Sequence, residues 1–224
     1  MVTRAMRSVG RPSTAVLTRE RIVRAALTLI DEVGADAFSV NALATRLEVS
    51  PSSLYNHVSG KDDLLVGVQE VITDAIDSAM FTTQPWADAV AAWARSYRAA
   101  FVRHPHAIPL FATSPVAGAI RTMEMYERVV RGFEHAGWAP EHIISAVVAL
   151  ESFILGSALD AAAPTGLLSP GGASDHVPQL SAAVDAHEQA AAGTSTTGAD
   201  MAFETGLAAM ITGLAAHHHQ GEAT

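Results

Sequence analysis

The chain has 224 residues, of which 49% are hydrophobic, which is enough for a small domain and a larger domain with its own core. It contains no cysteine, which excludes disulfides and thiolate metal sites and favours a reducing, cytoplasmic location. The first sixteen residues lack the apolar stretch of a secretion signal, and later apolar runs carry charges or helix breakers. We therefore expect no membrane span.

The net charge of −9 is unevenly distributed along the chain. Residues 1–61 hold eight Lys/Arg against five acidic residues (+3), whereas residues 62–224 hold six Arg against eighteen acidic residues (−12). A basic end on an acidic remainder would approach a polyanion such as DNA with the basic end first. An ordinary solvated surface explains a charge of +3 equally well.

Three short helices are predicted at the basic end. Apolar residues recur with helical spacing from Ile22 and predict a first helix that ends at Gly34. Ser39 is a suitable N-cap for a second helix. Ser50 and the proline after it combine an N-cap with proline at the first helical position, and so begin a third helix, expected to continue to Val58.

The remaining elements are also predicted to be helical. The fourth helix should run over 61–78, with two aspartates in its first turn, and join the two parts of the chain. No segment alternates like a strand, so we expect an all-α fold. Residues 164–198 are rich in small residues and predict a mobile connection with one helix near 179–191. The other helices are predicted at about 86–103, 105–112 (short and irregular), 116–136, 140–162 and 199–218.

The second and third predicted helices have the spacing of a helix-turn-helix, although many helical proteins contain a tight helix pair. The string "TRERIVRAALTLIDEVGADAFSVNALATRLEVSPSSLYNHVSGKDDLL", from Thr18 to Leu65, resembles the DNA-binding domain of the TetR family almost position for position. This resemblance implies a flexible basic arm (1–17), a three-helix DNA-binding domain (18–64) and a ligand-binding and dimerisation domain (65–224). It also implies a homodimer on a palindromic double-stranded operator, released by a small-molecule effector.

Short polar side chains are expected on the outer face of the third helix. Asparagine can pair with adenine, and serine can bond either partner of a base pair. The resemblance implies backbone and thymine-methyl contacts for an aromatic residue and a histidine on this helix, and a phosphate contact for the cap of the second helix. The predicted DNA-contacting residues are Ser39, Asn41, Ser50, Pro51, Ser52, Ser53, Tyr55, Asn56, His57 and Lys61.

Other interpretations of these residues remain open. The serines and Asn56 could be plain solvated positions, Tyr55 could be a core residue, and capping alone would justify Ser39. Lys61 is the only lysine, and it stands at a helix N-terminus, where the macrodipole disfavours a cation. A phosphate partner explains Lys61 better than helix stability does.

Three features depart from the family pattern or extend beyond it. Glu48 replaces the usual turn glycine and should cost about 1 kcal/mol if its backbone is left-handed. Asn41 and Pro51 stand where the tetracycline repressor has longer polar readers, so its operator sequence is not carried over. Arg4 and Arg7 could reach into the minor groove, or belong to an unstructured tail.

The later segments "WARSYRAAFVRHPHAIPLFATSP", "YERVVRGFEHAGW" and "AVVALESFILGSALD" resemble the C-terminal domain of tetracycline-repressor-type regulators. In such proteins the helix predicted at 140–162 and the last helix form a four-helix dimer interface. The helix predicted at 140–162 is apolar nearly all round, which is consistent with burial in such an interface. A core helix of a monomer would have the same apolar pattern. The predicted interface residues are Ile143, Ile144, Val147, Ile154, Leu207, Ile211 and Leu214.

The helix predicted at 86–103 carries an aromatic stripe that the resemblance assigns to an effector pocket, whereas plain core is the alternative. Few charges are placed to face inward in the sequence, so we expect a largely apolar effector. Leu110 stands where the tetracycline repressor has a metal-binding histidine, which argues against a magnesium–tetracycline effector; no metal and no cofactor is expected. The predicted pocket residues are Trp93, Tyr97, Leu110, Phe111, Thr113, Met125 and Phe153.

No enzyme is expected, because the sequence contains no GxSxG, P-loop or HExxH motif. We interpret His104, His106 and the histidines at 217–219 as solvated side chains. The alternative to a regulator is a helical ligand-binding or scaffolding protein without specific DNA binding.

Overall fold

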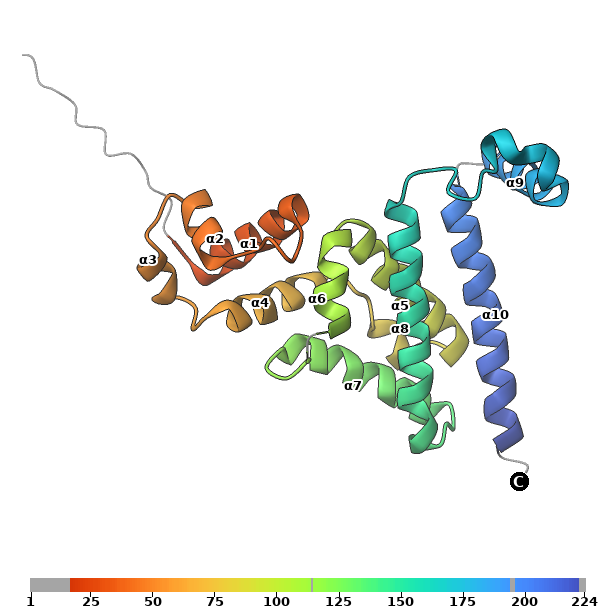
Figure 1. Ribbon diagram of the computed structural model, residues 1–224. Coiled ribbons are helices and arrows are strands. Elements are labelled where there is room, and N and C mark those ends of the chain that lie inside the picture. Colours follow the sequence, from red (N-terminus) through yellow and green to blue (C-terminus); the bar gives the residue numbers. More distant parts are fainter. Residues whose placement is uncertain (1–16, 114, 194–195, 222–224) are drawn as a thin grey trace, which may run out of the picture.

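The computed structural model describes residues 17–113, 115–193 and 196–221, and every regular element in these ranges is a helix (Figure 1). The expected all-α fold is confirmed. The possible minor-groove arm with Arg4 and Arg7 lies outside the described residues.

Four helices gather at one end of the molecule and form what we call the head: α1 (Arg19–Val33), α2 (Val40–Arg46), α3 (Pro51–Tyr55) and α4 (Lys61–Thr73) (Figure 1). A side-chain cap begins each of the first three, because the hydroxyls of Thr18, Ser39 and Ser50 accept backbone N–H bonds from the first turns. The predicted starts of α2 and α3 are therefore confirmed. The head core includes the fully buried Ile22, Ile30, Leu43, Leu54 and Leu64.

Two helices of the head are shorter than predicted. α3 ends at Tyr55, where the His57 N–H donates to the Leu54 carbonyl three residues earlier and tightens the chain into a turn. α4 ends at Thr73, so the expected continuous helix over 61–78 is wrong. Ile76 lies in the turn that follows α4 and is nevertheless buried. Its burial explains why the apolar spacing in the sequence continues beyond the end of the helix.

The other helices form the body, in which α5 (Trp86–Val102) packs on α8 (Pro140–Ala162). Between them come η2 (Pro105–Ala107), α6 (Ile108–Thr113) and α7 (Ile120–His135). α7 begins later than the predicted residue 116 because Gly118 takes a φ of 91°, which is incompatible with a helix. Aromatic side chains fill the far end of this body: Phe81 of η1 (Ala79–Thr82), Trp86, Phe133 and Trp138.

The last part of the chain returns along the body. α10 (Gly198–Gly221) runs beside α8, and α9 (Pro178–Ala192) stands off at one end of this pair (Figure 1). The helix expected near 179–191 is confirmed, and η3 (Gly171–His176) precedes it. Of the helices in the described ranges, α8 alone is long and apolar enough to cross a membrane, yet Leu150 and Ile154 on it are buried in the body.

Glu48, in the turn between α2 and α3, has a φ of 56°, so the left-handed backbone expected at this position is present. We expect Glu48→Gly to raise the free energy of unfolding by about 1 kcal/mol, because glycine adopts this conformation without a Cβ clash. Glu48→Ala is the matched control and should bring no such gain. Denaturant unfolding measures both variants, and an equal effect of the two substitutions would contradict the backbone explanation.

Candidate nucleic-acid interface and effector site

The outward face of α3 and the turn after it is polar and accessible. Ser52, Asn56 and His57 are exposed, and Tyr55 has 54% of its surface accessible. Leu54 is fully buried and fixes α3 to the head. The interpretation of Tyr55 as a core residue is therefore wrong, and this face is free to meet another molecule.

The hydroxyl groups at the start of α3 form one cluster. Ser50 Oγ lies 2.8 Å from the Oγ atoms of both Ser52 and Ser53, and it also accepts the Ser53 N–H. Ser39 caps α2 in the same manner. Two of the ten predicted DNA contacts, Ser39 and Ser50, thus have structural roles of their own, while Asn41 and Pro51 are exposed beside them.

Ion pairs neutralise part of the positive charge of the head. Arg19, Arg24 and Arg46 pair with Asp63, Glu20 and Glu32. Burial alone would raise the pKa of Asp63, but hydrogen bonds from the Ser59 N–H and Arg19 lower it below its usual value. The exposed Lys61 makes no ion pair with any described residue, and its Nζ lies 5.8 Å from the centre of the Phe38 ring. Lys61 is therefore an accessible positive charge, six residues after the end of α3.

Two polar junctions connect the head to the body. At the first, Asp31 of α1 meets His104 (Oδ2 to Nδ1, 2.8 Å), and its backbone carbonyl accepts from His106 Nδ1 at 2.6 Å. Both histidines are thus bonded to the head; His104 is only partly exposed, whereas His106 is solvent-exposed as interpreted from the sequence. At the second, the buried hydroxyls of Thr73 (α4) and Thr122 (α7) lie 2.9 Å apart, and Arg121 pairs with Asp74. A shift of α5 or α7 would therefore act directly on the head.

An aromatic row extends along α5. Ring centres are 5.4 Å apart between Trp93 and Tyr97 and again between Tyr97 and Phe101, and Phe101 meets Phe111 of α6 at 4.6 Å. Trp93 is fully buried, and its indole Nε1 has no hydrogen-bond partner in the described part of the chain. Tyr97 is also buried, so neither residue is exposed in the way that a preformed open pocket would require.

Glu151 was missed by the sequence analysis and lies beside this row, at Tyr97. Its Oε1 accepts a hydrogen bond from the Tyr97 hydroxyl at 2.9 Å and another from the Tyr126 hydroxyl. Burial raises the pKa of Glu151, although both tyrosine donors act in the opposite direction. Burial likewise raises the pKa of Tyr97 and of Tyr126. The sequence analysis did not foresee this partly buried carboxyl group beside the aromatic row.

The other predicted pocket residues do not all lie near the aromatic row. Met125 is buried, and Leu110 and Phe111 are half-buried near the aromatic row, whereas Thr113 is exposed at the end of α6. Phe153 stacks on Phe203 of α10 with ring centres 5.5 Å apart. Residues two apart on a helix point in different directions, so Phe153 faces away from Glu151. It lines instead a separate groove of about 340 Å³ between α8 and α10, with Ser152, Gly156, Ser157, Asp160, Ala202 and Phe203.

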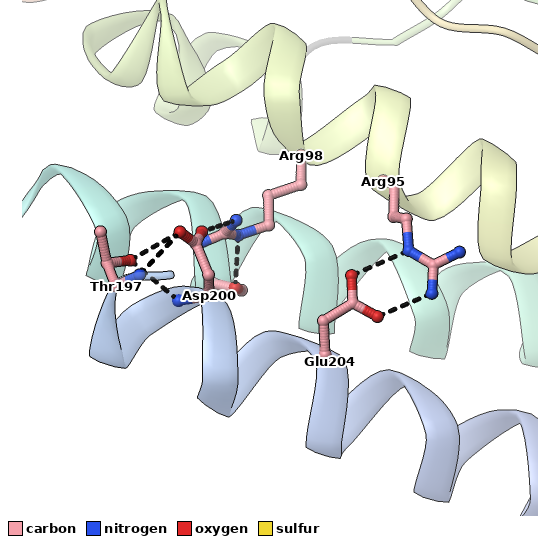
Figure 2. A network of polar contacts seen from close by, with 6 residues as sticks. Arg95, Arg98, Thr197, Asp200 and Glu204 are labelled. Carbon is pink, nitrogen blue, oxygen red and sulfur yellow. Dashed lines mark hydrogen bonds and ion pairs between the residues drawn. The ribbon is translucent and has the colours of Figure 1, made fainter. Parts of the chain in front are cut away.

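Two arginines of α5 reach across to α10 (Figure 2). Arg98 is buried; it donates to Ser157 Oγ at 2.9 Å and to Asp200 Oδ1 at 2.6 Å, and its guanidinium lies over the Phe203 ring. Hydrogen bonds from Arg98 lower the pKa of Asp200. Arg95 holds Glu204 with bonds of 2.8 and 2.7 Å, which lower the pKa of that carboxyl group. α10 is therefore fastened to α5 as well as to α8.

The predicted dimer-contact residues lie on two different faces. Ile143, Val147, Ile154 and Leu207 are buried within the subunit, so they contact its own core and were wrongly assigned to a partner. Ile144 has 61% of its surface exposed, as Val148 has 52%, and Ile211 and Leu214 are half-buried. The apolar surface of α8 is thus the stripe that contains Ile144, Val148 and Leu159.

Within the described residues, no group of three or more histidine or acidic side chains is placed to hold a metal ion.

Comparison with known proteins identifies both parts of the chain. Residues 22–68 match the family model for bacterial regulatory proteins of the tetR family, and residues 82–218 match the tetracyclin repressor-like C-terminal domain. The tetracycline repressor protein class A from transposon 1721 of Escherichia coli is 31% identical over 87% of this chain and 88% of its own length. An HTH-type transcriptional regulator of Saccharopolyspora erythraea is 31% identical over 63% of this chain, but the match spans only 60% of that protein.

Solved structures agree with this assignment. Apo ActR from Streptomyces coelicolor superposes with a TM-score of 0.72 at 27% identity and covers 94% of this chain and 99% of its own. ActR in complex with actinorhodin gives 0.69 at 26% identity, over 91% and 99% of the two chains. The helix-turn-helix head and the helical body are therefore those of one known family, and the chain belongs to the tetR family of bacterial regulatory proteins.

Proposed function

We propose that the protein is a cytoplasmic, ligand-responsive repressor that binds a palindromic operator as a homodimer and leaves it when a small molecule binds the body. The observation that carries this proposal is the exposed polar face of α3, held in place by the buried Leu54 and flanked by Lys61. A dimer presents two such faces to two half-sites of a palindrome. We propose no catalytic residue in this protein.

In this proposal each of the two parts of the chain has its own function. Residues 18–64 read the operator, with Ser52, Ser53 and Asn56 at base edges and Lys61 at a phosphate. Residues 65–224 dimerise through the exposed stripe of α8 together with α10, and bind the effector beside the aromatic row of α5. The similar protein ActR has been solved in complex with actinorhodin, which supports a small-molecule ligand for this protein as well.

Effector binding would act on DNA through the two polar junctions. The ligand must prefer the body conformation in which the two heads are wrongly spaced for the operator. A hundredfold release of DNA requires a preference of about 2.7 kcal/mol, which a few repacked aromatic contacts can supply. Because α4 ends at Thr73, the junction between Thr73 and Thr122, and not a continuous helix over 61–78, would connect the body to the head here.

Site selection from random DNA, followed by footprinting, tests the proposed operator. Lys61→Ala should weaken binding to all sequences alike and reduce the slope of log affinity against log salt by about one, because one phosphate contact is lost. Asn56→Ala should relax the preference at one base position in each half-site.

Arg131→Ala is the matched control for the lost charge, since Arg131 is exposed on α7 and pairs with Glu127. It should leave both the affinity and the selected sequence unchanged. Selection that enriches no sequence would favour the alternative of a ligand-binding protein without specific DNA binding. An unaltered preference in Asn56→Ala would remove this residue from the base readers.

A further inference from the structure

Three helices of the body contribute to one partly buried polar cluster, which consists of Tyr97 (α5), Tyr126 (α7) and Glu151 (α8). Both tyrosine hydroxyls donate to the same oxygen of Glu151. No salt bridge of Glu151 occurs in the ranges that the structure describes, although most other polar clusters of the body contain an arginine. The carboxyl group is therefore held by neutral donors alone.

An ionised carboxylate in this position has no positive charge beside it among the described residues. Transfer of an ionised carboxylate out of water is costly unless a positive charge accompanies it. Burial accordingly raises the pKa of Glu151, against the effect of the two tyrosines. A cation placed beside Glu151 would supply the missing partner and stabilise the ionised form.

The surroundings of Glu151 suit the rest of such a ligand. The rings of Trp93, Tyr97 and Phe101 follow one another at 5.4 Å, and aromatic faces attract cations. Tyr126 and Glu151 are only half-buried, so part of the cluster is accessible to solvent.

We propose that the effector is an organic cation with an aromatic skeleton, which places a protonated amine beside Glu151 and its rings along the aromatic row of α5. This inference rests on the proposed function, which places the effector in the body. It revises the expected apolar ligand to a lipophilic amine. A neutral molecule of the same shape would leave the carboxyl group unpaired, and an anion would be repelled by it.

Calorimetric titration with three probes of one shape tests the charge requirement. The probes are 1-naphthylmethylamine, which is protonated at neutral pH, 1-naphthalenemethanol, which is neutral, and 1-naphthoate, which is anionic. The wild-type dissociation constant should be at least about tenfold lower for the amine than for the alcohol, with the naphthoate weakest. Glu151→Gln should weaken the amine by about tenfold or more and leave the alcohol within about threefold.

Controls separate charge from folding. The glutamine amide oxygen can still accept both tyrosine bonds, and helical circular dichroism verifies that this variant is folded. Glu127→Gln removes an equal charge from the exposed side of α7 and should leave amine binding unchanged. Tyr126→Phe keeps the charge and removes one competing donor, so amine binding should not weaken.

A wild-type protein that binds the amine no more tightly than the alcohol, or does not bind it at all, would overturn the proposal, as would amine binding that is unaffected by Glu151→Gln. Failure of the proposed regulatory function is a different result, because it appears in DNA-site selection without any probe. A protein that selects an operator but does not prefer the amine would contradict this inference alone.

Discussion

Replacing both Ile144 and Val148 with aspartate is expected to produce a monomer that has lost specific operator binding. The two side chains are 61% and 52% exposed and lie one turn apart on α8, so the substitutions need not disturb the subunit core. In the proposed dimer they would place four unpaired carboxylates in an apolar interface. Operator affinity should fall by at least about a thousandfold, to the non-specific level, because a single head meets only one half-site.

Sedimentation velocity measures the oligomeric state, and fluorescence anisotropy at one fixed salt concentration measures the affinity. Ile120→Asp is the matched control, since Ile120 is 56% exposed at the start of α7, where an aspartate suits the helix. It should leave a DNA-binding dimer. Ile154→Asp is unsuitable for this purpose because the fully buried Ile154 would carry its charge into the core. A double variant that remains dimeric would exclude this stripe as the interface.

Trp93→Ala is expected to lower the free energy of unfolding by about 3–5 kcal/mol and the melting temperature by roughly 10 °C. Trp93 is fully buried and meets Phe81 edge-on at 6.2 Å and Tyr97 at 5.4 Å, so its removal leaves a cavity between α5 and η1. The interpretation of Trp93 as a pocket residue would suggest Trp93→Ala as a way to remove only the effector response. Because the substitution also destabilises the body, it is poorly suited to that purpose.

Thermal unfolding at equal protomer concentrations measures this loss. Trp93→Phe is the control: it keeps a ring in place, leaves a smaller cavity and deletes an N–H without a partner in the described ranges. Its loss of stability should be clearly smaller. If Trp93→Ala melted together with the wild type, the packing of this end of the body would have been misjudged.

The helix starts that could be predicted from the sequence were those with a capping residue or a proline within a few positions. Ser39 and Ser50 fixed the starts of α2 and α3, because a cap and a proline act within three or four residues. The end of α4 was missed because Ile76 keeps helical spacing while lying in a turn. The apolar pattern of α8 could not separate the inward Ile143 from the outward Ile144, since both faces of this helix are hydrophobic.

The polar cluster of the body could not be derived from sequence spacing. Glu151 meets tyrosines that are 54 and 25 residues away, on two other helices. In the sequence a single glutamate within an apolar helix resembles an ordinary solvated position. Only the packing of α5, α7 and α8 brings these three side chains together, and the same packing directs Phe153 away from them to α10.

Lys61 gives the chain one further property. It is the only lysine in 224 residues, and it is exposed at the first position of α4, beside the polar face of α3. Acetylation of a lysine removes its positive charge. Any modification of side-chain amines is therefore confined to the head, at the charge assigned to a phosphate, and the acidic body offers it no competing target. In the proposed DNA complex, a single acyl group on Lys61 would remove that phosphate contact and weaken DNA binding without any change at the effector site.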